Sequence, residues 1–142
     1  MSLTNWCEWL KERATEIVAP TSTDQIYSNI DPSRNFNGRW SLEFAEREIQ
    51  TINYITGATR ARRRLTAAVR ATSDVQAAAL AEDFRPFLLE ILSQGKADGR
   101  FSDYAIEQEE IGADARGLAI GESFYAFIDF VIVENKDFSA LI

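Results

Sequence analysis

The chain has 142 residues, of which 46% are hydrophobic and 26% are charged, and its net charge is −7. This length and composition predict one folded domain that buries a core without disulfides or metal ions. The acidic balance argues against nonspecific nucleic-acid binding as the main role, because neutralising phosphates requires a surplus of Lys and Arg.

The sequence contains no histidine and a single cysteine, Cys7. Ser/His/Asp and Cys/His catalytic sets and the common zinc and non-haem iron sites are therefore excluded. We expect no enzymatic activity and no cofactor. A single cysteine fits folding in a reducing compartment. We also expect no signal peptide and no membrane span, since the longest apolar run is too short to cross a bilayer as a helix.

Residues 2–19 are expected to form the first helix, which Pro20 should end. Apolar side chains recur in it at the spacing of one helix face. The members of this stripe are Leu3, Trp6, Cys7, Leu10, Ala14, Ile17 and Val18. Cys7 is expected to pack as a small hydrophobic residue. A variable, turn-rich loop follows at about 21–38, with residues 25–30 as a candidate edge strand.

Residues 39–56 fit a strand, since Trp40, Leu42 and Phe44 alternate with polar residues and β-branched residues follow. A helix is the competing interpretation. Gly57 should turn the chain into a second strand of a hairpin, residues 59–72. Its inward side chains are Leu65, Ala67, Val69 and Ala71.

The outward side of the predicted strand 59–72 carries Arg60, Arg62 and Arg64, with Arg63 and Arg70 nearby. This is the one basic concentration in an acidic chain. Such charges occur on solvated strand faces, where they discourage edge-to-edge aggregation. Alternatively, they form a contact surface for an acidic partner or for passing nucleic acid. The absence of an aromatic stacking platform among them weakens a sequence-reading role.

Ser73 and Gln76 match a capping box and predict the start of a second helix. Its apolar positions are Ala77, Leu80, Phe84, Phe87, Leu88, Ile91 and Leu92. Gly95 is placed to close this helix. Pro86 should kink or break it near residues 83–85, because proline removes a backbone donor and crowds the preceding turn.

Residues 101–110 fit the most acidic strand of the chain, with Asp103, Glu107 and Glu109 on the side opposite Tyr104 and Ile106. A glycine-containing link at 111–121 joins it to the next strand. Because it lacks a following helix and lysine, this link is expected to be a hairpin connection rather than a phosphate-binding loop.

Residues 122–134 form the longest apolar run and fit a strand with two apolar faces, interrupted only by Asp129. Such a strand is covered on both sides, by helices of its own chain or by another subunit. Asp129 is expected to reach water or pair with an arginine, because an unpaired buried carboxylate is costly. The tail, 135–142, ends in Phe138, Leu141 and Ile142, which suggests docking on a neighbouring subunit.

These elements predict a single α+β domain over residues 1–142. Its sheet should be mixed, mostly antiparallel and of about four to six strands, with two main helices packed on one face.

Several segments resemble one protein family. They are Asn-Trp-Cys-Glu-Trp-Leu at 5–10, the arginine strand running into Ser73-Asp74, Glu-Ile-Gly-Ala-Asp-Ala-Arg-Gly at 110–117 and Tyr-Ala-Phe-Ile-Asp-Phe at 125–130. With the order of elements, they are similar to the tail-terminator, or minor capsid and tail-completion, proteins of long-tailed bacteriophages.

The resemblance implies a non-enzymatic assembly protein that forms a ring, usually a hexamer. The ring would cap the tail tube, contact the tube protein and the head-tail connector, and let DNA pass its lumen without sequence-specific binding. It would belong to the virion neck and assemble in the cytoplasm of the bacterial host. The resemblance assigns no individual functional residue.

The residues themselves suggest how copies could join. An arginine strand and an acidic strand are complementary patches for a head-to-tail ring contact. The candidate interface residues are Arg60, Arg62, Arg64, Asp103, Glu107, Glu109, Asp129 and Phe138.

Two other functions remain open from the sequence. One is a small ligand-binding domain whose pocket is lined by Phe124, Phe127, Tyr104 and Trp40, with Asp129 as a polar anchor. The other is a carboxylate-dependent hydrolase that uses Asp129 with Glu107 or Glu109.

Overall fold

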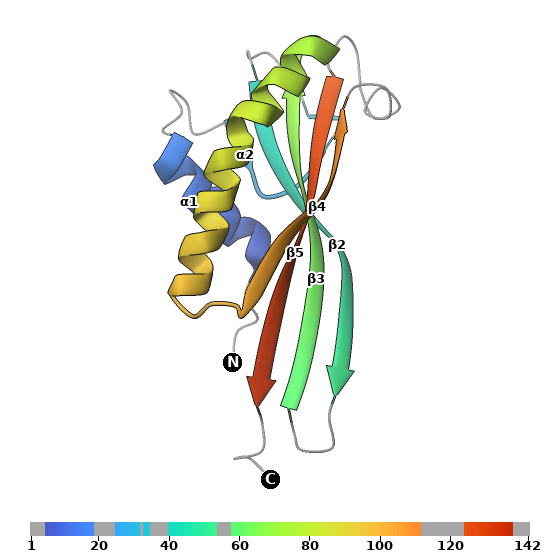
Figure 1. The fold of residues 1–142 in the computed structure, drawn as a ribbon. Coiled ribbons are helices and arrows are strands. Elements are labelled where there is room, and N and C mark those ends of the chain that lie inside the picture. The colour runs from blue at the N-terminus through green and yellow to red at the C-terminus, as the bar shows by residue number, and fades with distance from the viewer. Residues whose placement is uncertain are drawn as a thin grey trace.

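The computed structural model describes residues 5–18, 25–31, 33–34, 40–53, 58–111 and 124–137. Within them, in chain order, lie α1 (Trp6–Val18), β1 (Ile26–Tyr27), β2 (Trp40–Asn53), β3 (Ala58–Ala71), α2 (Asp74–Ala97), β4 (Asp103–Ile111) and β5 (Phe124–Asp137). The strands form one sheet in the order β1-β2-β3-β5-β4, antiparallel except for the short β1, which runs parallel to β2. Both helices lie on one face of it (Figure 1). The predicted α+β class is confirmed.

The predicted strand at residues 39–56, for which a helix was the competing interpretation, is confirmed as strand β2. β2 pairs with β3 as an antiparallel hairpin, with Trp40 opposite Ala71 and Asn53 opposite Thr59. The alternation of apolar and polar side chains favours a strand here. Leu42 and Phe44 point to the helices, and their sequence neighbours point to the other face. Residues 25–30 contribute only two residues, Ile26 and Tyr27, to the sheet edge.

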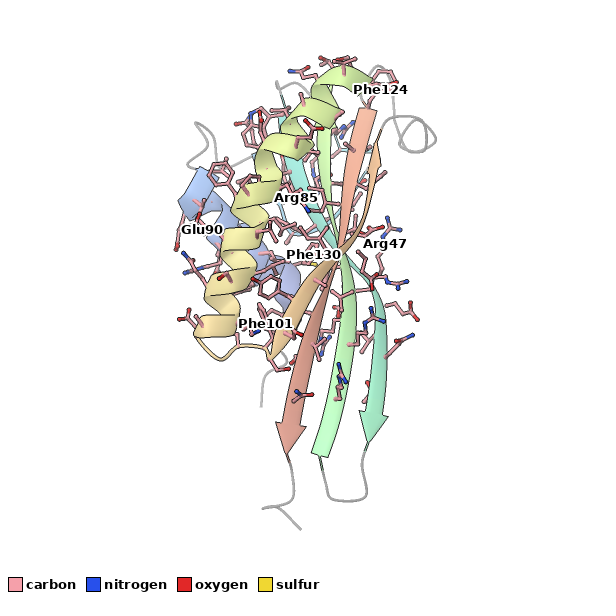
Figure 2. The ribbon with its side chains drawn as sticks, in the orientation of Figure 1. Arg47, Arg85, Glu90, Phe101, Phe124 and Phe130 are labelled. Atoms are coloured by element: carbon pink, nitrogen blue, oxygen red, sulfur yellow. The ribbon has the colours of Figure 1, made fainter. Side chains whose placement is uncertain are left out.

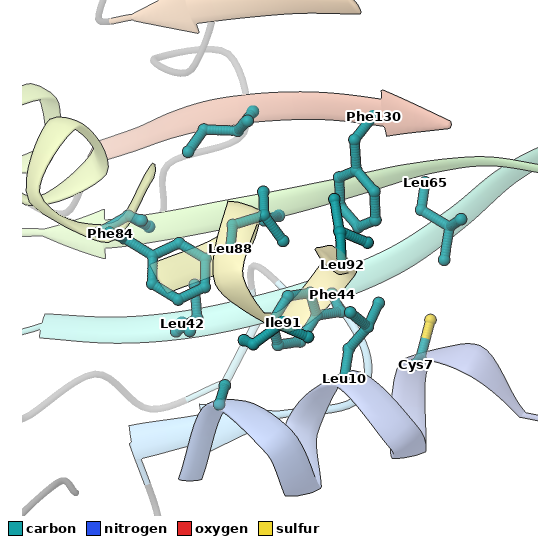
Figure 3. Close-up of a cluster of buried hydrophobic side chains, with 14 of the residues drawn as sticks. Cys7, Leu10, Leu42, Phe44, Leu65, Phe84, Leu88, Ile91, Leu92 and Phe130 are labelled. Atoms are coloured by element: carbon teal, nitrogen blue, oxygen red, sulfur yellow. The ribbon is translucent and has the colours of Figure 1, made fainter. Parts of the chain in front are cut away.

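The core lies between the two helices and the sheet (Figure 3). Leu10 of α1 and Leu88, Ile91 and Leu92 of α2 are completely buried there. The helix-facing side of β5 completes the core with Ala126, Ile128, Phe130 and Ile132. The predicted apolar stripes are thus the surfaces that meet, and their burial is the main source of stability.

Helix α2 begins as predicted but ends later. Ser73 is the N-cap, and its hydroxyl accepts from the Gln76 amide at 3.1 Å. The helix continues through Pro86 to Ala97, so of the kink or break predicted near residues 83–85 the break is wrong. Packing of the apolar face over both halves outweighs the one lost backbone donor.

Gly95 does not close the helix. It is a buried helical residue, and a Cβ at this position would lie 2.5 Å from the Phe101 ring and 2.8 Å from Trp9. The C-cap is Asp98, and Gly99 carries the positive φ of 75° that glycine favours after a helix. Glycine is therefore needed at position 95 because the rings of Phe101 and Trp9 lie so close, and at position 99 because the backbone has a positive φ.

The face of the sheet away from the helices is called the outer face below. At one end of it, Ile30 packs against Ala68, Tyr125 and Phe127 and so covers this side of β5. Both sides of β5 are therefore buried in that half, as predicted. The predicted turn at Gly57, the link beyond Ile111 up to position 121 and the tail residues 138–142 lie outside the described residues.

Candidate functional site

The outer face carries a charge network that joins β2, β3 and β4. Arg62 and Arg64 of β3 both pair with Glu107 of β4, and the Arg64 Nε to Glu107 Oε2 distance is 3.0 Å. Arg64 also lies 3.6 Å from Glu48 of β2. β5 separates β3 from β4, so the long arginine side chains reach over it. We call Glu48, Arg62, Arg64 and Glu107 the outer-face network.

Because of this network, the predicted complementary patches are not two separate surfaces of the subunit. The arginine strand and the acidic strand lie in the same sheet and neutralise one another within one chain. Since the side chains of Arg62 and Arg64 are 45% exposed, these pairs contribute little to stability.

A groove of about 450 Å³ lies beside the network. Val131 and Val133 of β5 form its apolar part, and Arg60, Arg62 and Asp103 are its charged members. Asp103 additionally lies 3.7 Å from Lys96 of α2. Tyr104 and Ala105 of β4 also line the groove, and the two valines are nearly buried, at 2% and 8% exposure.

Asp129 is held by partners in its own chain. It accepts a hydrogen bond from Thr66 Oγ1, and the same hydroxyl accepts from Arg47 Nε at 3.1 Å. Arg47 lies at an irregularity in the β2 register between Glu46 and Glu48, on the side away from the helices (Figure 2). The expected direct pairing of Asp129 with an arginine is therefore not what the structure has: the half-buried carboxylate bonds to Thr66, and Arg47 is linked to it only through the Thr66 hydroxyl.

A second ionic cluster, not predicted from the sequence, lies under segment 25–34. Glu43 is fully buried, and its carboxylate lies 2.6 Å from Arg34 and accepts from the Asp31 amide at 3.2 Å. Burial raises the pKa of Glu43, while Arg34 and the Asp31 amide oppose that effect. Arg70 donates to the Arg34 carbonyl at 3.0 Å. The cluster fastens segment 25–34 to the outer face.

Arg63 belongs to the opposite face, toward the helices. Its guanidinium pairs with Glu134 and, at 2.7 Å, with Glu46. Trp6 of α1 donates to the same Glu134 carboxylate at 3.2 Å. This arginine therefore anchors α1 to the sheet, whereas its neighbours Arg62 and Arg64 serve the outer face. The separation follows from the two-residue period of a strand.

The predicted aromatic pocket does not form. Trp40 and Tyr104 pack on the helix-side core, whereas Phe127 belongs to the outer-face cluster. Phe124 and Tyr104 are also distant along the sheet, since Phe124 aligns with Ala71 and Tyr104 with Ile132. The predicted lining is thus divided between two faces and two ends.

The carboxylates proposed for hydrolysis have structural partners. Glu107 pairs with two arginines, and Asp129 accepts from Thr66. The backbone of Glu109 lies opposite Ile128, and its side chain lies outside the described part of the structure, as does Phe138. Among the described residues, no group of three or more His, Cys, Asp or Glu side chains is placed to hold a metal ion.

No protein-family model and no characterised protein matches this chain. Of the two helices described, neither is long and apolar enough to cross a membrane.

Proposed function

We propose that this chain is a structural assembly protein of a long-tailed bacteriophage. Its copies form a ring that closes the tail tube and joins it to the head connector. The observation that carries the proposal is a sheet that runs past its helices and leaves an arm of strands that no described helix covers.

The arm consists of residues 50–53 of β2, 58–61 of β3 and 135–137 of β5. These three strands have 14 residues each, about 46 Å at 3.3 Å per residue, well above the usual strand length. Figure 1 shows their ends beyond the last turn of α2. Every described side chain in the arm is exposed or half-buried: Gln50, Thr51, Arg60, Ala61 and Asn135.

An uncovered arm adds no core to its own subunit. Projecting strands are a liability in an isolated domain, because their edges pair with other chains. They suit an assembly in which neighbouring copies cover them. The groove and the outer-face network lie directly beside the arm, so one continuous surface is available to a neighbour.

Ring closure requires heterologous contacts, in which two different surfaces of the subunit meet. The net charge of −7 also suits a lumen that DNA crosses without adhering.

Mass in solution tests the proposal. Multi-angle light scattering of the purified chain should give a defined multiple of 16.0 kDa that persists on dilution into the micromolar range. A 16.0 kDa species at every concentration would refute it. If that monomer also melted higher with a small molecule bound, a ligand-binding domain would be favoured instead.

A further inference from the structure

The helix-covered side of the protein contains an apolar hollow at the end of the sheet where α2 begins. Its apolar lining comes from α1, β2, β3 and α2, and its volume is about 150 Å³. The lining residues are Val18, Trp40, Leu42, Val69, Leu80, Phe84 and Phe87, with Asp83 beside them. Phe87 is 39% exposed, one of the few large apolar side chains that face solvent among the described residues.

The size of the hollow indicates what it can hold. Ligand pockets for drug-sized molecules are about 300–1,000 Å³, so this hollow is too small for such a molecule. A cavity of about 150 Å³ lined by apolar side chains does accept a benzene ring. One phenyl or branched aliphatic side chain from another segment therefore fits.

The sequence supplies side chains of this kind at the opposite end of the molecule. β5 ends at Asp137 and is followed by Phe138-Ser139-Ala140-Leu141-Ile142. Val69, which lines the hollow, aligns with Ala126 of β5. The strand from Ala126 to Asp137 covers about 35 Å at 3.3 Å per residue. Figure 1 shows the β5 arrowhead and the first turn of α2 at opposite ends of the sheet.

The five residues after Asp137 reach at most about 18 Å even when fully extended. They fall far short of the hollow in their own subunit. The hollow of a second copy is not subject to this limit, because a neighbouring subunit can place it close to the tail. We propose that the apolar residues Phe138, Leu141 and Ile142 of one subunit dock in the apolar hollow of the next.

This inference rests on the proposed self-assembly and specifies its contact. The tail and the hollow are different surfaces at opposite ends of one subunit, so the contact is head-to-tail and can repeat around a ring. Phe138 offers the best match, since its phenyl ring is the size that such a hollow accepts.

Complementation of two variants tests it. In the tail variant, Phe138, Leu141 and Ile142 are each changed to Ser; in the hollow variant, Phe87→Glu places a charge at the rim. Each alone should associate at least tenfold more weakly than the parent in sedimentation velocity. An equimolar mixture should form a 1:1 heterodimer, because one variant keeps the hollow and the other keeps the tail.

Val75→Glu is the matched control. Val75 is also apolar, is 79% exposed and lies on the same helix, but it does not line the hollow. This variant should associate like the parent. All variants should melt within about 3 °C of the parent, since none replaces a fully buried side chain in the described core.

The outcomes separate the two proposals. A parent that forms rings while both variants also do so refutes the docking of the tail and leaves the assembly function standing. Loss of association in the hollow variant alone assigns the hollow to a different segment and likewise refutes tail docking. A parent that stays monomeric refutes both.

Discussion

Replacement of Gly95 by alanine tests how α1, α2 and β4 are joined. Gly95 lies inside α2, where a Cβ would meet two atoms of the Phe101 ring at 2.5 and 2.6 Å and Trp9 at 2.8 Å. These rings cannot withdraw easily. Trp9 and Phe101 are 7% and 4% exposed, and each makes an edge contact with Trp6, at centroid distances of 5.5 and 5.7 Å.

Two effects oppose one another in Gly95→Ala. Alanine favours the helix over glycine by about 1 kcal/mol. Overpacking of a well-packed core costs about 1–3 kcal/mol, and three contacts below 3 Å with two locked rings place this site at the upper end. We therefore expect a net loss of about 2 kcal/mol in the free energy of unfolding. For a domain of this size, that corresponds to a melting temperature lower by about 6–8 °C.

Urea unfolding monitored by tryptophan fluorescence measures the change. The exposed neighbour Gln94→Ala is the control and should stay within about 0.5 kcal/mol of the parent. In a Phe101→Leu background the smaller side chain leaves room, so Gly95→Ala should cost less than in the parent, with a coupling of about 1 kcal/mol or more. A Gly95→Ala variant as stable as the parent would show that the close approach is not what glycine serves here.

Three further predictions concern the cap, the thiol and the outer face. Ser73→Ala should lower the free energy of unfolding by about 1 kcal/mol, because it leaves the Gln76 amide without its cap; Ser73→Asp should retain most of it. Burial raises the pKa of the Cys7 thiol to about 11. The native protein should therefore resist thiol reagents near pH 8. Its free energy of unfolding should fall as the pH rises from the ordinary thiol pKa toward 11. If Cys7→Ala left this pH dependence of stability unchanged, the assignment of the effect to Cys7 would be wrong. Changing Arg60, Arg62 and Arg64 to Glu should weaken ring formation in light scattering at several salt concentrations while shifting the melting temperature little, because these side chains are exposed. Intact rings at every salt concentration would exclude this face from the contact.

Much of the fold follows from local patterns in the sequence. The heptad-like stripe around Leu10, the alternation at Trp40, Leu42 and Phe44, and the two apolar faces of β5 each specify an element and its buried side. Ser73 marks a helix start because its hydroxyl acts on the adjacent turn. Signals of this kind need no knowledge of the rest of the chain.

Features that depend on the order of strands could not be predicted in this way. Arg62 and Glu107 are 45 positions apart, and they meet only because β5 lies between β3 and β4. The same holds for Glu134 with Arg63, which are 71 positions apart. The two-residue period of a strand predicts which face each side chain is on, but it does not predict which strands are neighbours. Charges that pair within one chain were therefore expected to be contact surfaces between two chains.

Other errors had a signal that could have corrected them. Phe124 and Phe127 differ by an odd number of positions, so a strand must place them on opposite faces, and they could not line one pocket. The position of Gly95 near the end of the apolar stripe predicts a helix end, although glycine serves close packing equally well. Of these two glycines, Gly99 has the positive φ that is common just after a helix end.

Electron microscopy of the purified 142-residue chain shows directly whether its copies form a ring. We expect annular particles of uniform diameter with a central hole and a fixed number of subunits. Fields of small compact particles with no hole, at a concentration where light scattering shows no larger species, would contradict the assignment of this protein to a ring-forming assembly.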